Sequence, residues 1–128
     1  MPASPARSIT VLIADDDPGF RDALADTVRS DPALRLVAAA QDAPGAVAAA
    51  GELQPDVALV DVRMPGGGRE AARGIREVSP ETAVLALSAF GDAASEAHMR
   101  GAGVSSYLTK GCSVEEILTA IHRSAEAP

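Results

Sequence analysis

Aromatic residues are scarce in this chain, which has no tryptophan, one tyrosine and two phenylalanines among its 128 residues. A hydrophobic core must therefore be built from Ala, Val, Leu and Ile, which suits helices packed closely on a sheet. The same scarcity leaves little to stack on a flavin ring, so a flavin-binding domain is a weak interpretation. The length is typical of one domain, and such a domain buries roughly two-thirds of the surface of its unfolded chain.

Cysteine, positive charge and long apolar runs are scarce as well. The single Cys112 excludes an internal disulfide and fits a reducing compartment. The net charge of −7 at pH 7 argues against nucleic-acid binding, because nothing would offset the repulsion of phosphates. No apolar run reaches the length that spans a membrane, and residues 1–8 lack the apolar region of a signal peptide. We therefore expect a cytoplasmic domain with neither a nucleic-acid nor a membrane partner.

What the chain does contain is a repeated alternation of apolar strands and amphipathic helices. Short apolar runs bounded by turn residues predict strands, and apolar residues at helical spacing predict the segments between them to be helices. The expected strands are 9–14, 34–40, 57–61, 82–87 and 104–108. The expected helices are 20–30, 43–53, 69–78, one that ends near Arg100, and one that runs from a capping box at Ser113 and Glu116 to about Arg123.

This alternation with short connections predicts an α/β fold with a single doubly wound parallel sheet. Right-handed crossovers favour the five-stranded order 2-1-3-4-5, with helices on both faces. No stretch is rich enough in Gly, Ser or Pro to separate two domains. We expect one domain over residues 9–124, with a flexible N-terminus at 1–8 and a flexible C-terminus, or the start of a linker, at 125–128.

The carboxyl ends of all strands in such a sheet meet at one edge, which is where ligands bind in open α/β folds. The chain places the following polar residues after strands one, three, four and five: Asp15, Asp16, Asp17, Asp61, Ser88 and Lys110. Asp61 directly follows four apolar residues of a strand that reads as buried on both faces. A buried strand has no packing use for a carboxylate, so Asp61 calls for a chemical explanation.

These residue types together suit phosphoryl transfer. Clustered carboxylates repel one another unless a cation lies among them, and oxygen ligands favour a hard cation such as Mg²⁺. An aspartate beside such a metal can attack phosphorus and form an acyl phosphate. The transferred group then needs a cation such as Lys110 and a hydroxyl such as Ser88. Each residue alone has an ordinary explanation, and Asp17 before Pro18 can equally be a helix N-cap.

The residues that carry a family resemblance are the stretch Leu12-Ile13-Ala14-Asp15-Asp16-Asp17-Pro18, Asp61 with Met64-Pro65-Gly66, the pair Ser88-Ala89, and Tyr107-Leu108-Thr109-Lys110. As an ordered set they resemble the signature of the bacterial two-component response regulator receiver domain, a CheY-like superfamily with a flavodoxin-like fold. The resemblance covers residues 9 to about 124. The position of Pro18, three residues after the first acid, is similar to receivers attached to helix-turn-helix output domains.

The resemblance implies a catalytic role for several of these positions. Asp61 is expected to be the phospho-acceptor. Asp15 and Asp16 are expected to hold Mg²⁺ with Asp61 and the backbone carbonyl of Arg63. Counting back from Asp61 also accommodates Asp16 and Asp17 as the acidic pair. The choice between Asp15 with Asp16 and Asp16 with Asp17 therefore stays open.

The resemblance also implies the parts of a switch. Lys110 is expected to bind the phosphate after transfer, the Ser88 hydroxyl to hydrogen-bond it, and the Tyr107 ring to turn inward as the aromatic partner of that shift. Arg63 and Phe90, each two residues past a site residue, are expected to control the access of water to the phosphate. They would thereby set the lifetime of the acyl phosphate.

The implied function is a phosphoacceptor receiver that a sensor histidine kinase phosphorylates on Asp61 and that switches a protein-interaction surface. Such a domain catalyses only its own phosphotransfer and dephosphorylation, so we do not expect an enzyme. The chain is either a stand-alone receiver or part of a longer protein with an output domain after Pro128, and proteins that it resembles commonly form homodimers on phosphorylation.

Two alternatives stay open. Gly66-Gly67-Gly68 makes a short, glycine-rich loop, and Gly111 stands where many receivers have a cis proline. These departures are the reason to retain a second interpretation, a degenerate receiver that binds proteins without being phosphorylated. A metal-dependent phosphatase with an aspartyl nucleophile would need a second aspartate where this chain has Arg63.

Overall fold

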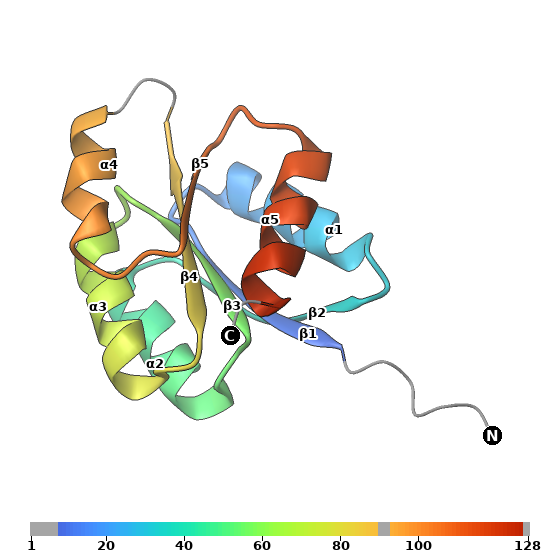
Figure 1. Ribbon diagram of the computed structural model, residues 1–128, viewed down its shortest axis with the longest axis horizontal. Helices are drawn as coiled ribbons and strands as arrows, with labels where there is room; N and C mark the ends of the chain where they lie inside the picture. The colour runs from blue at the N-terminus through green and yellow to red at the C-terminus, as the bar shows by residue number, and fades with distance from the viewer. Residues whose placement is uncertain (1–7, 90–92, 127–128) are drawn as a thin grey trace.

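The computed structural model describes residues 8–89 and 93–126, and within them it has five parallel strands and five helices (Figure 1). The elements are β1 (Ile9–Ala14), α1 (Pro18–Arg29), β2 (Leu34–Ala40), α2 (Ala43–Leu53), β3 (Val57–Asp61), α3 (Gly68–Val78), β4 (Ala83–Ser88), α4 (Ala93–Arg100), β5 (Ser106–Thr109) and α5 (Val114–Glu126). The strand order is β2-β1-β3-β4-β5, which confirms the predicted topology.

Several element boundaries differ from the prediction by a few residues. Helix α1 begins at Pro18 instead of residue 20, because Asp17 caps it and proline is well tolerated in the first helical turn. Strand β5 starts only at Ser106, where its pairing with β4 begins. Helix α5 continues to Glu126, because Ala125 still packs against the core. The Ser113 capping box is present, with Glu116 N–H donating to Ser113 Oγ at 3.1 Å.

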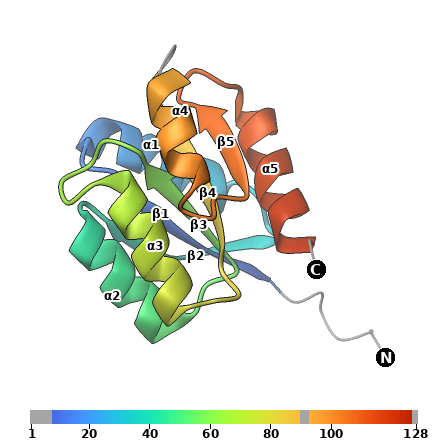
Figure 2. The same ribbon diagram turned by 60° about the vertical axis from the view of Figure 1, so that its left-hand side comes forward.

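Helices α1 and α5 cover one face of the sheet, and α2, α3 and α4 cover the other (Figures 1 and 2). Each face carries its own hydrophobic cluster. Residues of one strand alternate between them, so that Val57 and Leu59 face α1 and α5 while Ala58 and Val60 face α2, α3 and α4. All four of these β3 residues are fully buried. The central strand is therefore held from both sides, and the position of Asp61 at its end is fixed by the core.

The connection between β3 and α3 is fixed by three consecutive glycines. Gly66 and Gly67 adopt φ values of +88° and +89°, which side chains other than glycine rarely adopt. Gly68 is the first residue of α3, and a Cβ there would lie 2.4 Å from the Cα of Val62 and 2.7 Å from the carbonyl oxygen of Asp61. The glycine-rich loop thus allows α3 to start directly against the backbone of Asp61.

We expect the substitution Gly68→Ala to reduce the free energy of unfolding by about 2 kcal/mol, the scale of overpacking against backbone that cannot move aside. Gly111→Ala is the matched control, because a Cβ at Gly111 meets nothing within 4 Å. Urea denaturation of both variants measures the difference. Equal stability of the two variants would contradict the close packing of α3 against Asp61.

A side-chain pair joins the end of α1 to α5. Nε2 of His122 lies 2.8 Å from Oδ2 of Asp31. Its hydrogen bond is the largest cause of a lowered pKa for Asp31, and the Ala33 amide adds to it. Because the folded pKa lies below the ordinary carboxyl value of about 3.9, the stabilisation is present above that value and is lost as the pH falls through the folded pKa.

We therefore expect His122→Ala to reduce the free energy of unfolding by about 0.5 kcal/mol at neutral pH, since the pair is partly exposed and screened by solvent. The difference from the wild type should vanish in strong acid, where Asp31 is protonated. Denaturation curves from neutral pH to about pH 2 measure this, and a double-mutant cycle with Asp31→Asn isolates the pair. A difference independent of pH would count against the interaction.

Candidate functional site

Three carboxylates gather at the carboxyl edge of the sheet. Strands β1 and β3 pair directly, with Ala14 opposite Val60, so Asp15 and Asp61 follow on neighbouring strands. Asp15 is fully buried, Asp61 is 4% exposed, and Asp16 is exposed to solvent. Oxygen atoms of the three side chains lie within 4.8 Å of one another. The fold therefore produces a cluster of two buried acidic side chains and one exposed one, which we call the acidic pocket.

Asp17 belongs to a different structure. Its Oδ1 accepts hydrogen bonds from the backbone amides of Gly19 at 3.0 Å and Phe20 at 3.4 Å, which makes it the N-cap of α1. The metal-capable cluster found among the described residues contains Asp15, Asp16 and Asp61. The geometry thus separates the acidic triplet into two pocket residues and one helix cap.

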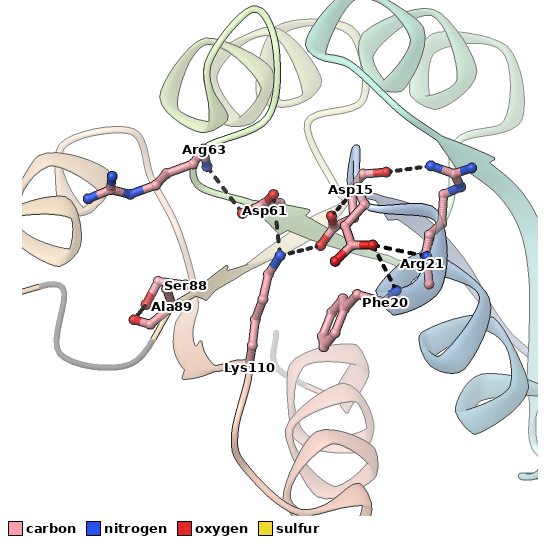
Figure 3. Close-up of polar contacts among 10 residues, drawn as sticks. Asp15, Phe20, Arg21, Asp61, Arg63, Ser88, Ala89 and Lys110 are labelled. Atoms are coloured by element: carbon pink, nitrogen blue, oxygen red, sulfur yellow. Dashed lines mark hydrogen bonds and ion pairs between the residues drawn. The ribbon is translucent and has the colours of Figure 1, made fainter.

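Backbone groups fix the two buried carboxylates. The amide of Asp17 donates to Oδ1 of Asp15 at 2.8 Å, and the amide of Arg63 donates to Oδ1 of Asp61 at 3.2 Å. The Arg21 guanidinium also donates to the backbone carbonyl of Asp15 at 2.9 Å. These bonds leave the Oδ2 atoms of both aspartates directed toward the pocket (Figure 3).

Lys110 supplies the cation of the pocket. Its backbone amide donates to the carbonyl of Ser88 at 2.8 Å, which ties the end of β5 to the end of β4. The Nζ atom reaches Oδ2 of Asp15 at 2.7 Å and Oδ2 of Asp61 at 3.4 Å (Figure 3). The ammonium thus lies between two buried carboxylates. The lysine side chain is 24% exposed, so water reaches it only in part.

The electrostatics of the pocket follow from burial and from charges of the same sign. Burial raises the pKa of Asp61, and the nearby charge of Asp15 raises it further, while the Arg63 amide and Lys110 oppose the shift. Burial alone would lower the pKa of Lys110, but its close contact with Asp15 and the charge of Asp61 outweigh burial and raise it. One ammonium thus pairs with Asp15 and Asp61 in a cluster of three acidic side chains, so the cluster keeps an excess of negative charge.

The residues present fit a hard divalent cation. All the donors are oxygens, as Mg²⁺ prefers. Oδ2 of Asp15 is fully buried, and its contact among the described residues is the ion pair with Nζ of Lys110 at 2.7 Å. A buried carboxylate oxygen that is satisfied only in part is suited to metal coordination.

The predicted switch residues lie beside this pocket but do not enter it. Ser88 is buried, and its hydroxyl donates to the carbonyl of Ala89 at 3.3 Å, on the side away from Asp61 (Figure 3). Tyr107 already packs against the cluster beneath α2, α3 and α4, and its hydroxyl is buried with no hydrogen-bond partner among the described residues. The Arg63 side chain is exposed, and Phe90 lies outside the described residues.

Two residues of the site do not stand out in the sequence. Phe20 belongs to the apolar spacing of α1, yet its ring centroid lies 4.6 Å from Nζ of Lys110. Arg21 reads as a surface residue, yet it holds the backbone of Asp15. The sequence feature that points to them is their place in the first turn of α1, shortly after β1 ends beside Asp15.

Comparisons with known proteins agree with this geometry. A sequence model of the response regulator receiver domain matches residues 11–122. The transcriptional regulatory protein LnrK of Bacillus subtilis is 35% identical over 114 residues, which cover 88% of this chain and 52% of LnrK. The chain belongs to the response regulator receiver family, and it spans about half the length of the curated relatives it matches.

Solved structures show the same fold. The signal receiver domain of NarL from Mycobacterium tuberculosis aligns with a TM-score of 0.89 at 29% identity, over 95% of this chain and 99% of that one. The receiver domain of the sensor histidine kinase PA1611 from Pseudomonas aeruginosa aligns with a TM-score of 0.84 at 25% identity, over 94% and 99% of the two chains. No helix in residues 8–89 and 93–126 is both long and apolar enough to cross a membrane.

Proposed function

We propose that this receiver is a phosphorylation switch in which Asp61 accepts a phosphoryl group from the phosphohistidine of a sensor kinase. The observation that carries the proposal is the position of Lys110, whose ammonium lies between the buried carboxylates of Asp15 and Asp61 at 2.7 and 3.4 Å. A nucleophilic carboxylate, a cation beside it and an acidic cluster that can hold a metal ion are the parts that phosphoryl transfer requires.

Asp15, Asp16 and Asp61, with the carbonyl oxygen of Arg63, would hold Mg²⁺ in this pocket. The ion supplies positive charge that offsets the acidic cluster and the phosphoryl oxygens. The all-oxygen donor set supports this assignment, as does the PA1611 receiver, which has a magnesium ion coordinated in its active site cleft. Asp17 is occupied as a helix cap, which favours Asp15 and Asp16 as the acidic pair.

The chain's own residues carry the transfer. Oδ1 of Asp61 is held by the Arg63 amide, so Oδ2, which lies 3.4 Å from the Lys110 ammonium, is the oxygen that would attack phosphorus in line. A P–O bond to Asp61 forms as the P–N bond breaks, and the bonding pair returns to the imidazole nitrogen of the kinase. Lys110 then pairs with the phosphoryl oxygens, because its ammonium already lies 3.4 Å from Asp61.

Phosphorylation would be sensed through β4 and β5. The new group adds close to two negative charges and several hydrogen-bond acceptors. We expect the Ser88 hydroxyl to rotate from the Ala89 carbonyl toward the phosphate. Tyr107 pairs with Ala86, two residues before Ser88 on the adjacent strand, so the shift would alter the packing around its ring and the surface of α4, β5 and α5. Arg63, with Phe90, would set the lifetime of the acyl phosphate by controlling water.

The interaction partners are proposed from the same family membership. LnrK is a transcriptional regulatory protein, and this chain spans 52% of its length. We propose that the receiver controls an output domain of that kind within a longer protein, in response to a sensor histidine kinase, and that phosphorylation favours a homodimer.

The test of the function is labelling with radioactive acetyl phosphate, with and without a chelator. Metal-dependent incorporation of up to one phosphoryl group per chain is expected, followed by slow loss. No incorporation with Mg²⁺ present would support a degenerate receiver and overturn the proposal. Steady turnover of a phosphate ester would instead indicate an aspartyl phosphatase.

The acidic pair is tested by comparing Asp16→Asn with Asp17→Asn. Because Asp16 offers an oxygen to the cluster and Asp17 is the cap of α1, Asp16→Asn should weaken Mg²⁺ binding by at least about tenfold, since even residues that only orient a metal ligand have effects of that size. Asp17→Asn should leave the affinity nearly unchanged, since asparagine is an equally good N-cap. Calorimetric titration with Mg²⁺ measures both affinities. A larger loss in Asp17→Asn than in Asp16→Asn would contradict the choice of Asp15 and Asp16 as the acidic pair.

A further inference from the structure

The ammonium of Lys110 has a third neighbour besides the two carboxylates. The ring of Phe20 lies beside it, with the centroid 4.6 Å from Nζ, and Figure 3 shows the ring next to the lysine side chain. Phe20 comes from the first turn of α1, whereas Lys110 follows β5. Two distant segments of the chain therefore meet at this contact.

The lysine needs such a contact because its own loop restrains it little. Gly111 follows directly, is exposed, and has nothing within 4 Å of the position of a Cβ. The hydrogen bond from the Lys110 amide to Ser88 fixes the backbone but leaves four rotatable side-chain bonds. Asp15 attracts the ammonium more closely than Asp61 does, at 2.7 Å against 3.4 Å. The Phe20 ring is the third group beside the ammonium, and it can oppose a drift of the lysine away from Asp61 toward Asp15.

We propose that Phe20 is a positioning residue for Lys110, whose ring face holds the ammonium within reach of the Asp61 carboxylate. This inference rests on the proposed function of Asp61 and adds the residue that orients its cation. The face of an aromatic ring is negative and attracts a cation within about 6 Å of its centroid, most strongly where water is partly excluded. With Lys110 24% exposed, this condition is met.

Packing against the core is the rival explanation for the position of Phe20. Phe20 is half-buried and lies against the cluster beneath α1 and α5. A leucine at position 20 would fill much of that space but would offer no negative face to the ammonium. The two explanations therefore differ in what they predict for Phe20→Leu and Phe20→Tyr.

Lys110 is the only lysine of the sequence, so lysine-selective ¹³C labelling gives the side-chain NMR signals of one residue. In the metal-free, unphosphorylated wild type, the ring current of Phe20 should displace the Cε proton signals from their free-lysine position. Phe20→Leu should return them toward that position, and Phe20→Tyr should keep them displaced. Wild-type signals at the free-lysine position would overturn the proposal.

The consequence for the reaction is measured with acetyl phosphate. Phe20→Leu should slow the labelling of Asp61 about three- to tenfold, the factor that corresponds to an ordinary cation–π contact, and Phe20→Tyr should restore the rate. Leu118→Ala is the control for lost stability, since Leu118 packs on the same cluster and lies on α5. An equal slowing in Leu118→Ala, or no slowing in Phe20→Leu, would overturn the positioning role.

The two experiments separate this inference from the proposed function. If the wild type takes up no phosphate but the Lys110 signals still respond to Phe20→Leu, the phosphoacceptor role of Asp61 fails while the placement of the lysine by Phe20 stands. If the wild type is labelled normally and the Lys110 signals ignore Phe20, the proposed function stands and the inference about Phe20 fails.

Discussion

Replacing Asp61 by asparagine should abolish covalent phosphorylation and raise the thermal stability at neutral pH. The amide has no oxygen nucleophile able to form an acyl phosphate, so acetyl phosphate should give no incorporation above background. The stability gain has a separate cause, because the wild-type carboxylate is almost fully buried 3.4 Å from its cation and beside Asp15. A gain of about 1 kcal/mol would raise Tm by about 4 °C in a domain of this size.

The pH dependence of this gain follows from the raised pKa of Asp61, which burial causes first and Asp15 second. A carboxyl whose folded pKa is raised favours the folded state below the unfolded value of about 3.9, and this contribution is lost as the pH rises through the folded pKa. The Asp61→Asn variant should therefore exceed the wild type in stability at neutral pH, and the gap should close toward about pH 4.

Asp26→Asn is the matched control for the Asp61 variant. Asp26 is exposed on α1, so its replacement changes the net charge by the same amount without touching the pocket. It should be labelled like the wild type and show no comparable change in Tm. A gain in Asp26→Asn as large as in Asp61→Asn would assign the effect to net charge rather than to the pocket.

Replacing Lys110 by methionine should slow phosphorylation by acetyl phosphate about 10²-fold or more, the usual effect of removing one fixed group that stabilises transition-state charge. Methionine keeps much of the length of the side chain but leaves the carboxylates of Asp15 and Asp61 without their ammonium. Stability should fall as well, because both carboxylates remain buried. Labelling rates and urea denaturation measure the two effects.

Arg123→Met is the control for Lys110→Met, because Arg123 is an exposed cation on α5 and the net charge changes equally. It should label at the wild-type rate. The pKa of Lys110 is raised, so its contribution to stability is complete below the ordinary lysine value of about 10.4 and is lost only as the pH rises through the folded value. If the difference in stability between the wild type and Lys110→Met disappeared between pH 6 and 8, this placement of the ammonium would be contradicted.

Much of the fold and the composition of the site could be predicted from local patterns in the chain. The uninterrupted run Val57–Val60 indicates a strand buried on both faces, and the structure shows all four residues fully buried. Because the ends of parallel strands share one edge, the prediction that Asp15, Asp61 and Lys110 lie together required only the strand order. Periodicity and chain connectivity carry this information.

Side-chain direction was beyond the reach of such patterns. Three consecutive aspartates look alike in sequence, and only the cap geometry of α1 shows that Asp17 turns to the Gly19 amide. The expected place of Ser88 at the end of β4 does not indicate that its hydroxyl donates to the Ala89 carbonyl in the unphosphorylated protein. Phe20 fitted the apolar spacing of a helix, so nothing local indicated that its ring meets Lys110. Rotamers and contacts between distant segments decide these points.

The central claim, that Asp61 is the residue that becomes phosphorylated, is tested most directly by trapping the acyl phosphate. Brief treatment with acetyl phosphate and Mg²⁺, followed by reduction with borohydride, converts a phosphorylated aspartate to homoserine, which peptide mass spectrometry locates. We predict homoserine at position 61, and none when a chelator is present. Homoserine at Asp15 or Asp16 instead, or at no position at all, would contradict the account.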